Sequence, residues 1–231
     1  MMGTRDRDPG RRLDPWKWTD LKKISFGILI LLIAGAGYGC PQKESTAAGE
    51  SPDKHYTNSE TGISFTYPEY LTAGTAAGAA VLHHDIPYKN GGACDMMGDE
   101  QEYDRLTDFE LKIQIIAKDL SEAVRDLSPY IPPENFVNGE LAASPGFIDA
   151  CTIGRYSGFA VYEGAEGCGY TRYYFRLSGN KTLVMTNASI QALSGAIVQE
   201  RVNEVLAVPG VISRERNTEI FESVVGSLII K

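Results

Sequence analysis

Residues 168–189, CGYTRYYFRLSGNKTLVMTNAS, contain the pattern that decides the fold. Cys168–Leu177 and Thr182–Ser189 are rich in the aromatic and β-branched residues that are typical of strands. Ser178–Asn180 between them has the composition of a turn. Because so short a connector joins antiparallel neighbours, the segment predicts a β-hairpin.

The two faces of the first predicted strand differ in character, because successive side chains of a strand point to opposite sides. One face carries Tyr170, Arg172, Tyr174 and Arg176, and the other carries Thr171, Tyr173, Phe175 and Leu177. The second face is the more apolar, and we expect it to cover the core. The tyrosine and arginine face is either a recognition surface or ordinary cross-strand packing, and we expect packing because such pairs are common.

The same alternation continues upstream of the hairpin and predicts a meandering antiparallel sheet. The predicted strands are Thr61–Pro68, Ala79–His84, Phe109–Ala117, Gly146–Ile153 and Phe159–Glu163, with a long Gly-rich and acidic loop over Pro87–Asp104.

Helical spacing of apolar residues is found in three places. It predicts a short helix over Glu122–Leu127, capped by Asp119 or Ser121, and a second over Ala196–Leu206. Asn217 or Thr218 is expected to cap a last helix that Gly226 ends, and Ser227–Lys231 is expected to close the chain as a strand. The fold class is therefore α+β, a mainly antiparallel sheet with two or three packed helices, preceded by a membrane segment.

The N-terminal part of the chain predicts an attachment to a membrane. Ile24–Tyr38 contains no charged residue and directly follows Lys22–Lys23. As a helix it would reach about 23 Å, which is shorter than a hydrocarbon core of about 30 Å. The seven basic residues before it favour a cytoplasmic N-terminus and an exported C-terminal part. The predicted organisation is a basic tail over 1–23, a signal or anchor over 24–40, a flexible tether over 41–55 and one extracytoplasmic domain over 56–231.

Three fates of this segment stay open. Cys40 follows a small residue, Gly39, as lipid attachment requires, although Gly37, Tyr38 and Pro41 make the match degenerate. The segment could also be retained as a short anchor or be cleaved after its glycines.

The charge of the predicted exported part excludes one class of partner. Residues 41–231 carry 15 basic and 26 acidic side chains, a formal charge of −11. Such a surface repels phosphate backbones, so we expect no nucleic-acid partner.

Three cysteines follow Cys40, and outside the cytoplasm thiols tend to pair. Cys94 and Cys168 each lie in a glycine-containing, loop-like sequence, which favours a disulfide between them. Cys151 lies in an apolar stretch and is expected to be a buried small residue. The other pairings stay open.

Few residues carry a pattern typical of chemistry. His83-His84-Asp85 is the nearest approach to a metal site, but adjacent histidines on a strand point to opposite faces. The acidic run lacks the order of an EF-hand, and we expect it to be a solvated loop; its members are Asp95, Asp99, Glu100, Glu102 and Asp104. We expect no cofactor, and we assign no catalytic or metal-binding residue.

The two ends of the predicted domain resemble a known family. The opening TGISFTYP, residues 61–68, and the closing IFESVVGSLIIK, residues 220–231, look like small exported bacterial domains of the PsbP-like type. The resemblance implies an antiparallel sheet with packed helices and supplies no site residues. The cysteines and the acidic loop depart from the simplest members.

Three functions are compatible with these patterns. The first is a membrane-tethered, non-catalytic module that binds a protein or another envelope partner. The second is an exported hydrolase with a site assembled from distant residues, for which His83, His84, Glu163 and Glu166 are the first suspects. The third is an assembly factor of an envelope complex. Since a fold alone specifies no activity, we expect the first.

Overall fold

A computed structural model describes residues 53–90, 102–165, 168–190 and 199–231, all within the unit Gly37–Lys231. The predicted membrane segment, Cys40 and Cys94 lie outside these residues. None of the helices within these described ranges has the length and apolar character of a membrane span.

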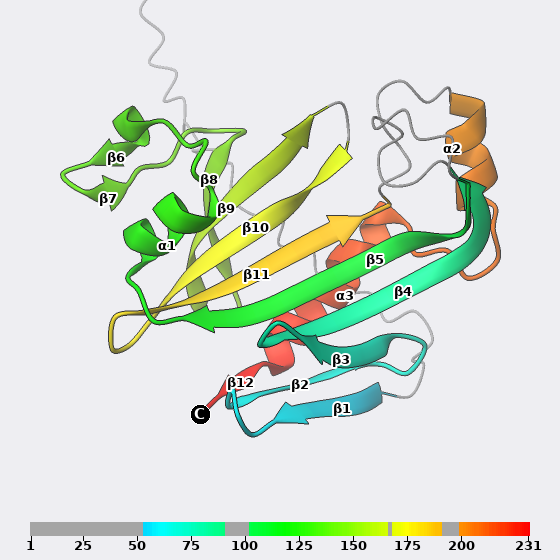
Figure 1. Cartoon of the computed structure of the whole chain (residues 1–231), viewed down its shortest axis with the longest axis horizontal. Helices are drawn as coiled ribbons and strands as arrows, with labels where there is room; N and C mark the ends of the chain where they lie inside the picture. The colour runs from blue at the N-terminus through cyan, green and yellow to red at the C-terminus, as the bar shows by residue number, and fades with distance from the viewer. Residues whose placement is uncertain (1–52, 91–101, 166–167, 191–198) are drawn as a thin grey trace, which may run out of the picture. The chain divides into compact units, whose positions relative to one another are not determined.

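Antiparallel strands dominate the domain, as the alternation predicts (Figure 1). The larger sheet has the order β3-β4-β5-β11-β10-β9-β8, and a smaller one has the order β1-β2-β12. The strands of the larger sheet are β3 (Thr72–Ala76), β4 (Ala79–Asn90), β5 (Tyr103–Ile116), β8 (Ile148–Ile153), β9 (Tyr156–Ala165), β10 (Cys168–Leu177) and β11 (Lys181–Ser189). Those of the smaller sheet are β1 (Asp53–Asn58), β2 (Ile63–Pro68) and β12 (Ile229–Ile230).

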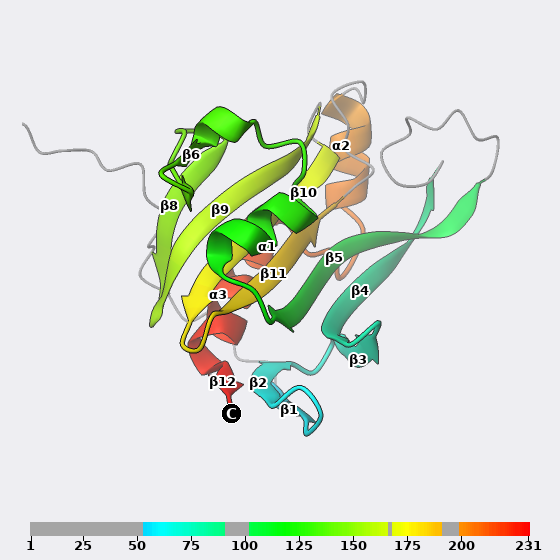
Figure 2. The same cartoon turned by 60° about the vertical axis from the view of Figure 1, so that its left-hand side comes forward.

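The remaining elements pack on the larger sheet or extend from it (Figures 1 and 2). The helices are α1 (Leu120–Leu127), the 3-10 turn η2 (Pro133–Asn135), α2 (Gln199–Leu206) and α3 (Arg214–Ser227), and β6 (Phe136–Val137) pairs with β7 (Glu140–Leu141). The α+β class is therefore confirmed.

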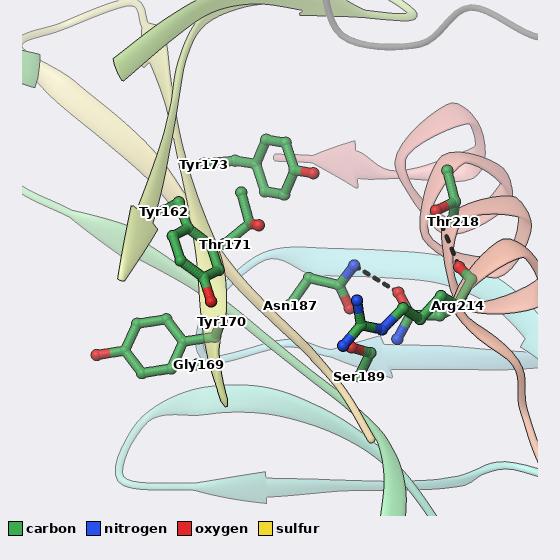
Figure 3. Close-up of a pocket in the computed structure, with 10 residues that line it drawn as sticks. Tyr162, Gly169, Tyr170, Thr171, Tyr173, Asn187, Ser189, Arg214 and Thr218 are labelled. Carbon is green, nitrogen blue, oxygen red and sulfur yellow. Dashed lines mark hydrogen bonds between the residues drawn. The ribbon is translucent and has the colours of Figure 1, made fainter. Parts of the chain in front are cut away.

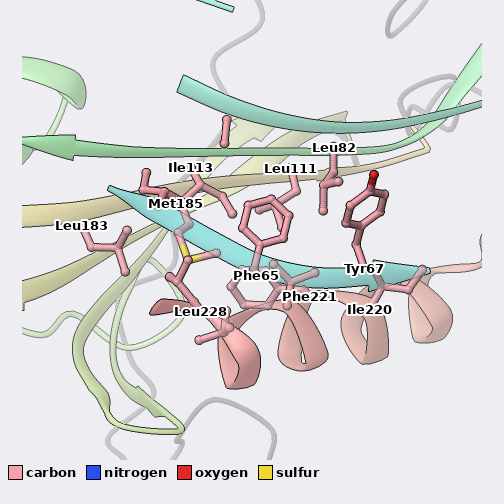
Figure 4. Packing of buried hydrophobic residues seen from close by; sticks show 14 of the residues in the cluster. Phe65, Tyr67, Leu82, Leu111, Ile113, Leu183, Met185, Ile220, Phe221 and Leu228 are labelled. Atoms are coloured by element: carbon pink, nitrogen blue, oxygen red, sulfur yellow. The ribbon is translucent and has the colours of Figure 1, made fainter. Parts of the chain in front are cut away.

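Apolar side chains on one face of the larger sheet pack against β2 and α3 and form the main core (Figure 4). Phe65 of β2 lies between Leu111 of β5 and Phe221 of α3, and all three side chains are fully or almost fully buried. Cys151 belongs to this core, as predicted. The terminal strand β12 pairs with β2, so its backbone is joined to the smaller sheet, while the Ile229 side chain is 49% exposed.

The opposite face of the larger sheet is also covered, and it forms a second core. Tyr174 and Val184 point to this face and are fully buried beneath Val124 of α1 and Leu141 of β7. Phe175 on the other side of β10 belongs to the main core, as expected. At Tyr174, the tyrosine and arginine face of β10 is therefore covered by other parts of the domain, as the packing interpretation predicts.

Several boundaries differ from the predictions. β1 begins at Asp53, inside the predicted tether, because it pairs with β2 along its whole length. β4 and β5 extend into the predicted loop as far as Asn90 and Tyr103, which pair with each other. The cap predicted at Asn217 or Thr218 is wrong, because Ser213 caps α3 by accepting a hydrogen bond from the Arg216 N–H at 3.2 Å.

Gly158 marks a close approach between two central strands and gives a first prediction. A Cβ atom there would lie 1.8 Å from the backbone oxygen of Tyr174, so an alanine must push β9 away from β10. We expect Gly158→Ala to lower the free energy of unfolding by about 1–3 kcal/mol in chemical denaturation. Gly74→Ala in β3 is the matched control, since no atom lies within 4 Å of its Cβ position. Equal effects of the two substitutions would contradict the prediction.

Candidate binding pocket

The histidines that the sequence singles out are bound to two different carboxylates. His83 Nε2 lies 3.0 Å from Asp85 Oδ2, and His84 Nδ1 lies 2.7 Å from Oδ1 of Asp108. Asp108 is fully buried, and its second oxygen accepts the backbone N–H of Ile212 at 2.7 Å. The His84–Asp108 pair therefore connects β4 and β5 to the chain that leads into α3.

Asp85 also receives the guanidinium of Arg105. Burial alone would raise the pKa of Asp85, but the hydrogen bonds from Arg105 and His83 outweigh it, so the pKa lies below its usual value. Within the described ranges, no group of three His, Cys, Asp or Glu side chains is placed to hold a metal ion.

Glu163 lies on β9, away from these histidines. Three strands separate β4 from β9 in the sheet, which corresponds to about 19 Å at the usual strand spacing. The structure therefore does not bring His83 or His84 together with Glu163, and Glu166 lies outside the described residues. The described residues therefore do not assemble the alternative hydrolase site, for which these four residues were the first suspects.

Glu163 instead forms a buried polar network beside the second core. Its Oε1 forms an ion pair with the Arg172 guanidinium at 2.6 Å and accepts from the Ser128 hydroxyl at 2.7 Å, and Oε2 accepts from the Tyr170 hydroxyl at 2.9 Å. Arg172 also donates to the backbone oxygen of Leu127, at the end of α1. Although burial opposes its charge, the hydrogen bond with Tyr174 and the carboxylate of Glu163 raise the pKa of Arg172. The network fixes α1 on the sheet.

A pocket of about 340 Å³ lies on the other face of the sheet, beside the start of α3 (Figure 3). Its floor is a row of side chains from three neighbouring strands. Thr171 of β10 stands opposite Tyr162 of β9 and opposite Asn187 of β11 in the strand register, so all three share this face. Gly169 and Ser189 continue the floor, and Tyr173 closes it towards the main core.

The wall of the pocket comes from the first two turns of α3. Arg214, Asn217 and Thr218 line it, and Thr218 donates its hydroxyl to the backbone oxygen of Arg214 at 3.1 Å (Figure 3). Ser213 fixes the start of the helix as its cap. Tyr173 stacks on Phe221 of α3 with ring centroids 4.4 Å apart, which joins the pocket to the main core.

Two asparagines connect floor and wall. Asn187 Nδ2 donates to Asn217 Oδ1 at 2.7 Å, and Asn217 Nδ2 donates to the backbone oxygen of Ala188 at 3.1 Å. Asn187 Oδ1 is left as a buried oxygen with no hydrogen-bond partner. Buried polar atoms are nearly always paired, so an unpaired acceptor at a pocket floor suits a ligand or a water that donates to it.

The described lining of the pocket is polar and aromatic. The described residues that line it supply hydroxyls, amides, tyrosine rings and a guanidinium, and none of these described residues is acidic. Pockets with a few placed polar groups beside aromatic rings are typical of small-ligand sites, and this volume is at the lower end of their range.

Sequence reasoning did not identify this pocket. The alternation of Cys168–Leu177 correctly placed Thr171 and Tyr173 on the face of Phe175, but the change from core to pocket along that face depends on where α3 begins. Since the cap was assigned to Asn217 or Thr218, the buried position of Asn217 was missed. One signal in the sequence could have identified the pocket: Thr171 and Asn187 are polar residues on a sheet face that is predicted to be apolar.

The cysteine predictions are tested only in part. Cys168 is the first residue of β10, paired with Ala165, while Cys94 lies outside the described residues. A disulfide between them stays a prediction, as does lipid attachment at Cys40.

Comparisons with known proteins identify no family. No family model and no curated protein matches the sequence. A crystal structure of a protein from Bacteroides thetaiotaomicron VPI-5482 is similar at 12% identity and a TM-score of 0.37, over 77% of this chain and 48% of that one, so the chain spans about half of its length. The solution structure of cyanobacterial PsbP (CyanoP) from Synechocystis sp. PCC 6803 is similar at 13% identity and a TM-score of 0.35, over 83% and 100% of the two chains. Both TM-scores are too low to assign this chain to a family or a function.

Proposed function

We propose that this protein is a membrane-tethered extracytoplasmic binding module, whose binding site is the pocket between the β9-β10-β11 face and α3. The unpaired Asn187 Oδ1 supports it most directly, because a donor on a ligand would satisfy that buried atom. The pocket floor is also built on three hydrogen-bonded strands, which hold its side chains in fixed register.

The location is a proposal that depends on the sequence. Lys22–Lys23 followed by the uncharged Ile24–Tyr38 favours export of the domain, and the acidic exported part suits a protein or envelope partner better than a nucleic acid. Mass spectrometry of the native N-terminus separates the three fates, because a lipid on Cys40, an intact Met1 and a new terminus have different masses.

A distant relation to PsbP-like domains is part of the proposal. The two sequence segments that carry the resemblance lie together in the fold, since Ile229 of β12 pairs with Ser64 of β2. An accessory role in an envelope complex, which such domains include, would be compatible with a ligand-binding module.

The binding function is tested on the full chain purified from native membranes in a polyoxyethylene detergent. Small molecules that stay bound through gel filtration are released by denaturation and identified by mass spectrometry. We expect Thr171→Phe, which fills the pocket floor, to lose molecules that the wild type retains. Thr57→Phe on β1 is the control, since Thr57 is an exposed strand threonine outside the pocket. The proposal would be rejected if the wild type retains no small molecule, or if Thr171→Phe retains the same molecules as the wild type.

A further inference from the structure

We infer that the ligand of this pocket is a polyhydroxylated ring, as in a mono- or disaccharide. The inference rests on the proposed function, because it names the ligand class of the same site. It is carried by the direction of the hydrogen bonds at the pocket floor.

The orientation of both asparagine amides follows from one backbone atom. The carbonyl of Ala188 can only accept, so Asn217 must present Nδ2 to it and Oδ1 to Asn187. Asn187 must then present Nδ2 to Asn217, which leaves its Oδ1 as an acceptor without a partner. Turning either amide over would place two acceptors or two donors against each other.

An acceptor at this position discriminates between ligand classes. The charged oxygens of a phosphate or carboxylate carry no proton and would be repelled by Asn187 Oδ1, whereas a hydroxyl can donate to it. A hydroxyl can also accept from a neighbouring donor, and the wall provides the guanidinium of Arg214. Several hydroxyls on one ring therefore match the mixture of acceptor, hydroxyl and guanidinium groups better than an anion does.

The side chain of Arg214 is a neighbour of Asn187 at the pocket. Figure 3 shows the Arg214 side chain beside Asn187 and Ser189. Arg214 is exposed, and its guanidinium can donate to one ligand hydroxyl while another hydroxyl donates to Oδ1.

The aromatic part of the pocket suits the apolar face of a sugar ring. Tyr162 stands beside Thr171 in the register, is 41% exposed and lines the pocket. A flat ring beside hydrogen-bonding groups presents an apolar body with polar neighbours, which is how tyrosines commonly serve in recognition.

The test measures binding of defined probes to the full chain by ligand-observed NMR saturation transfer. The saccharide probes are methyl glycosides of glucose and N-acetylglucosamine and their β-1,4-linked disaccharides. Inorganic phosphate and acetate are the anion probes, at constant ionic strength. A polyoxyethylene detergent is required, because the headgroup of a sugar detergent would itself be a probe.

The variants separate the pocket from the rest of the surface. We expect at least one saccharide to bind saturably, and Asn187→Leu to weaken that binding by about tenfold or more, because it removes the acceptor. Thr171→Val and Tyr162→Ala keep the test valid if Asn187→Leu does not fold, and Tyr162→Ala should weaken binding by about tenfold. Tyr103→Ala is the control, since Tyr103 is 42% exposed on β5 and does not line the pocket.

The outcomes distinguish this inference from the function on which it rests. If phosphate or acetate binds in the pocket and no saccharide does, the ligand class is wrong while a binding module remains. The ligand class is also wrong if the molecules that the wild type retains and Thr171→Phe loses have no polyhydroxylated ring. If no molecule is retained at all, the proposed function fails first. Saccharide binding that Asn187→Leu, Thr171→Val and Tyr162→Ala leave unchanged would overturn the assignment to this pocket.

Discussion

Replacing Arg172 with methionine is expected to lower the free energy of unfolding by about 3–5 kcal/mol, because it leaves a buried carboxylate without its cation. Arg172 and Glu163 form an ion pair of 2.6 Å with side chains only 13% and 9% exposed. Methionine keeps most of the apolar stem of the arginine, so the loss reports mainly on the charge. Urea denaturation followed by circular dichroism measures it.

A second arginine on the same strand provides the matched control. Arg176 pairs with Glu140 at 2.8 Å, but these side chains are 61% and 66% exposed. Since exposed ion pairs contribute about 0–1 kcal/mol, Arg176→Met should change stability little. The two substitutions have the same chemistry and differ in burial, so similar losses would mean that burial of the Arg172 pair does not govern its contribution.

A double substitution separates the pair from its surroundings. Glu163→Leu together with Arg172→Met removes both charges, so the protein should be more stable than with Arg172→Met alone. The Ser128 and Tyr170 hydroxyls still lose their acceptor, so recovery is expected to be incomplete. A double variant that is no more stable than Arg172→Met would show that the unpaired carboxylate is not the cause of the loss.

Local patterns predicted the central strands well. The alternation of apolar and polar side chains can be recognised within each strand by itself. Accordingly, β10 runs over Cys168–Leu177 as predicted. The cap of α1 at Asp119, one of two candidates, was also correct, since its carboxylate accepts the N–H of Glu122. In both cases the signal lies within a few neighbouring residues.

Contacts between distant segments explain what was missed. β3 and the β6-β7 hairpin are too short to show a period, and their existence depends on the neighbours with which they pair. Tyr174 is buried because α1 covers a face whose arginines suggest solvent. Asparagine is a common helix cap, but Asn217 lies inside α3, where its amide joins the helix to Asn187 and Ala188 of β11.

Replacing Phe221 with alanine is expected to lower the free energy of unfolding by about 3–5 kcal/mol, because it opens a cavity in the main core. Phe221 is almost fully buried on α3, and its ring stacks on Tyr173 with centroids 4.4 Å apart. Phe221→Leu should lose less, since it retains more of the buried volume. Leu206→Ala on α2 removes an exposed apolar side chain and is the control.

The same substitution tests whether the core positions the pocket. Tyr173 stacks on Phe221 and on Phe175 and lines the pocket, so Phe221→Ala removes the nearer of these two ring contacts and loosens the position of Tyr173. Molecules that the wild type retains should therefore bind more weakly to Phe221→Ala at temperatures where the variant is still folded, and Phe221→Leu should be intermediate. A variant that is destabilised as expected but retains these molecules like the wild type would show that Tyr173 is held in place without Phe221. A loss of stability no larger than that of Leu206→Ala would contradict the placement of Phe221 in the main core.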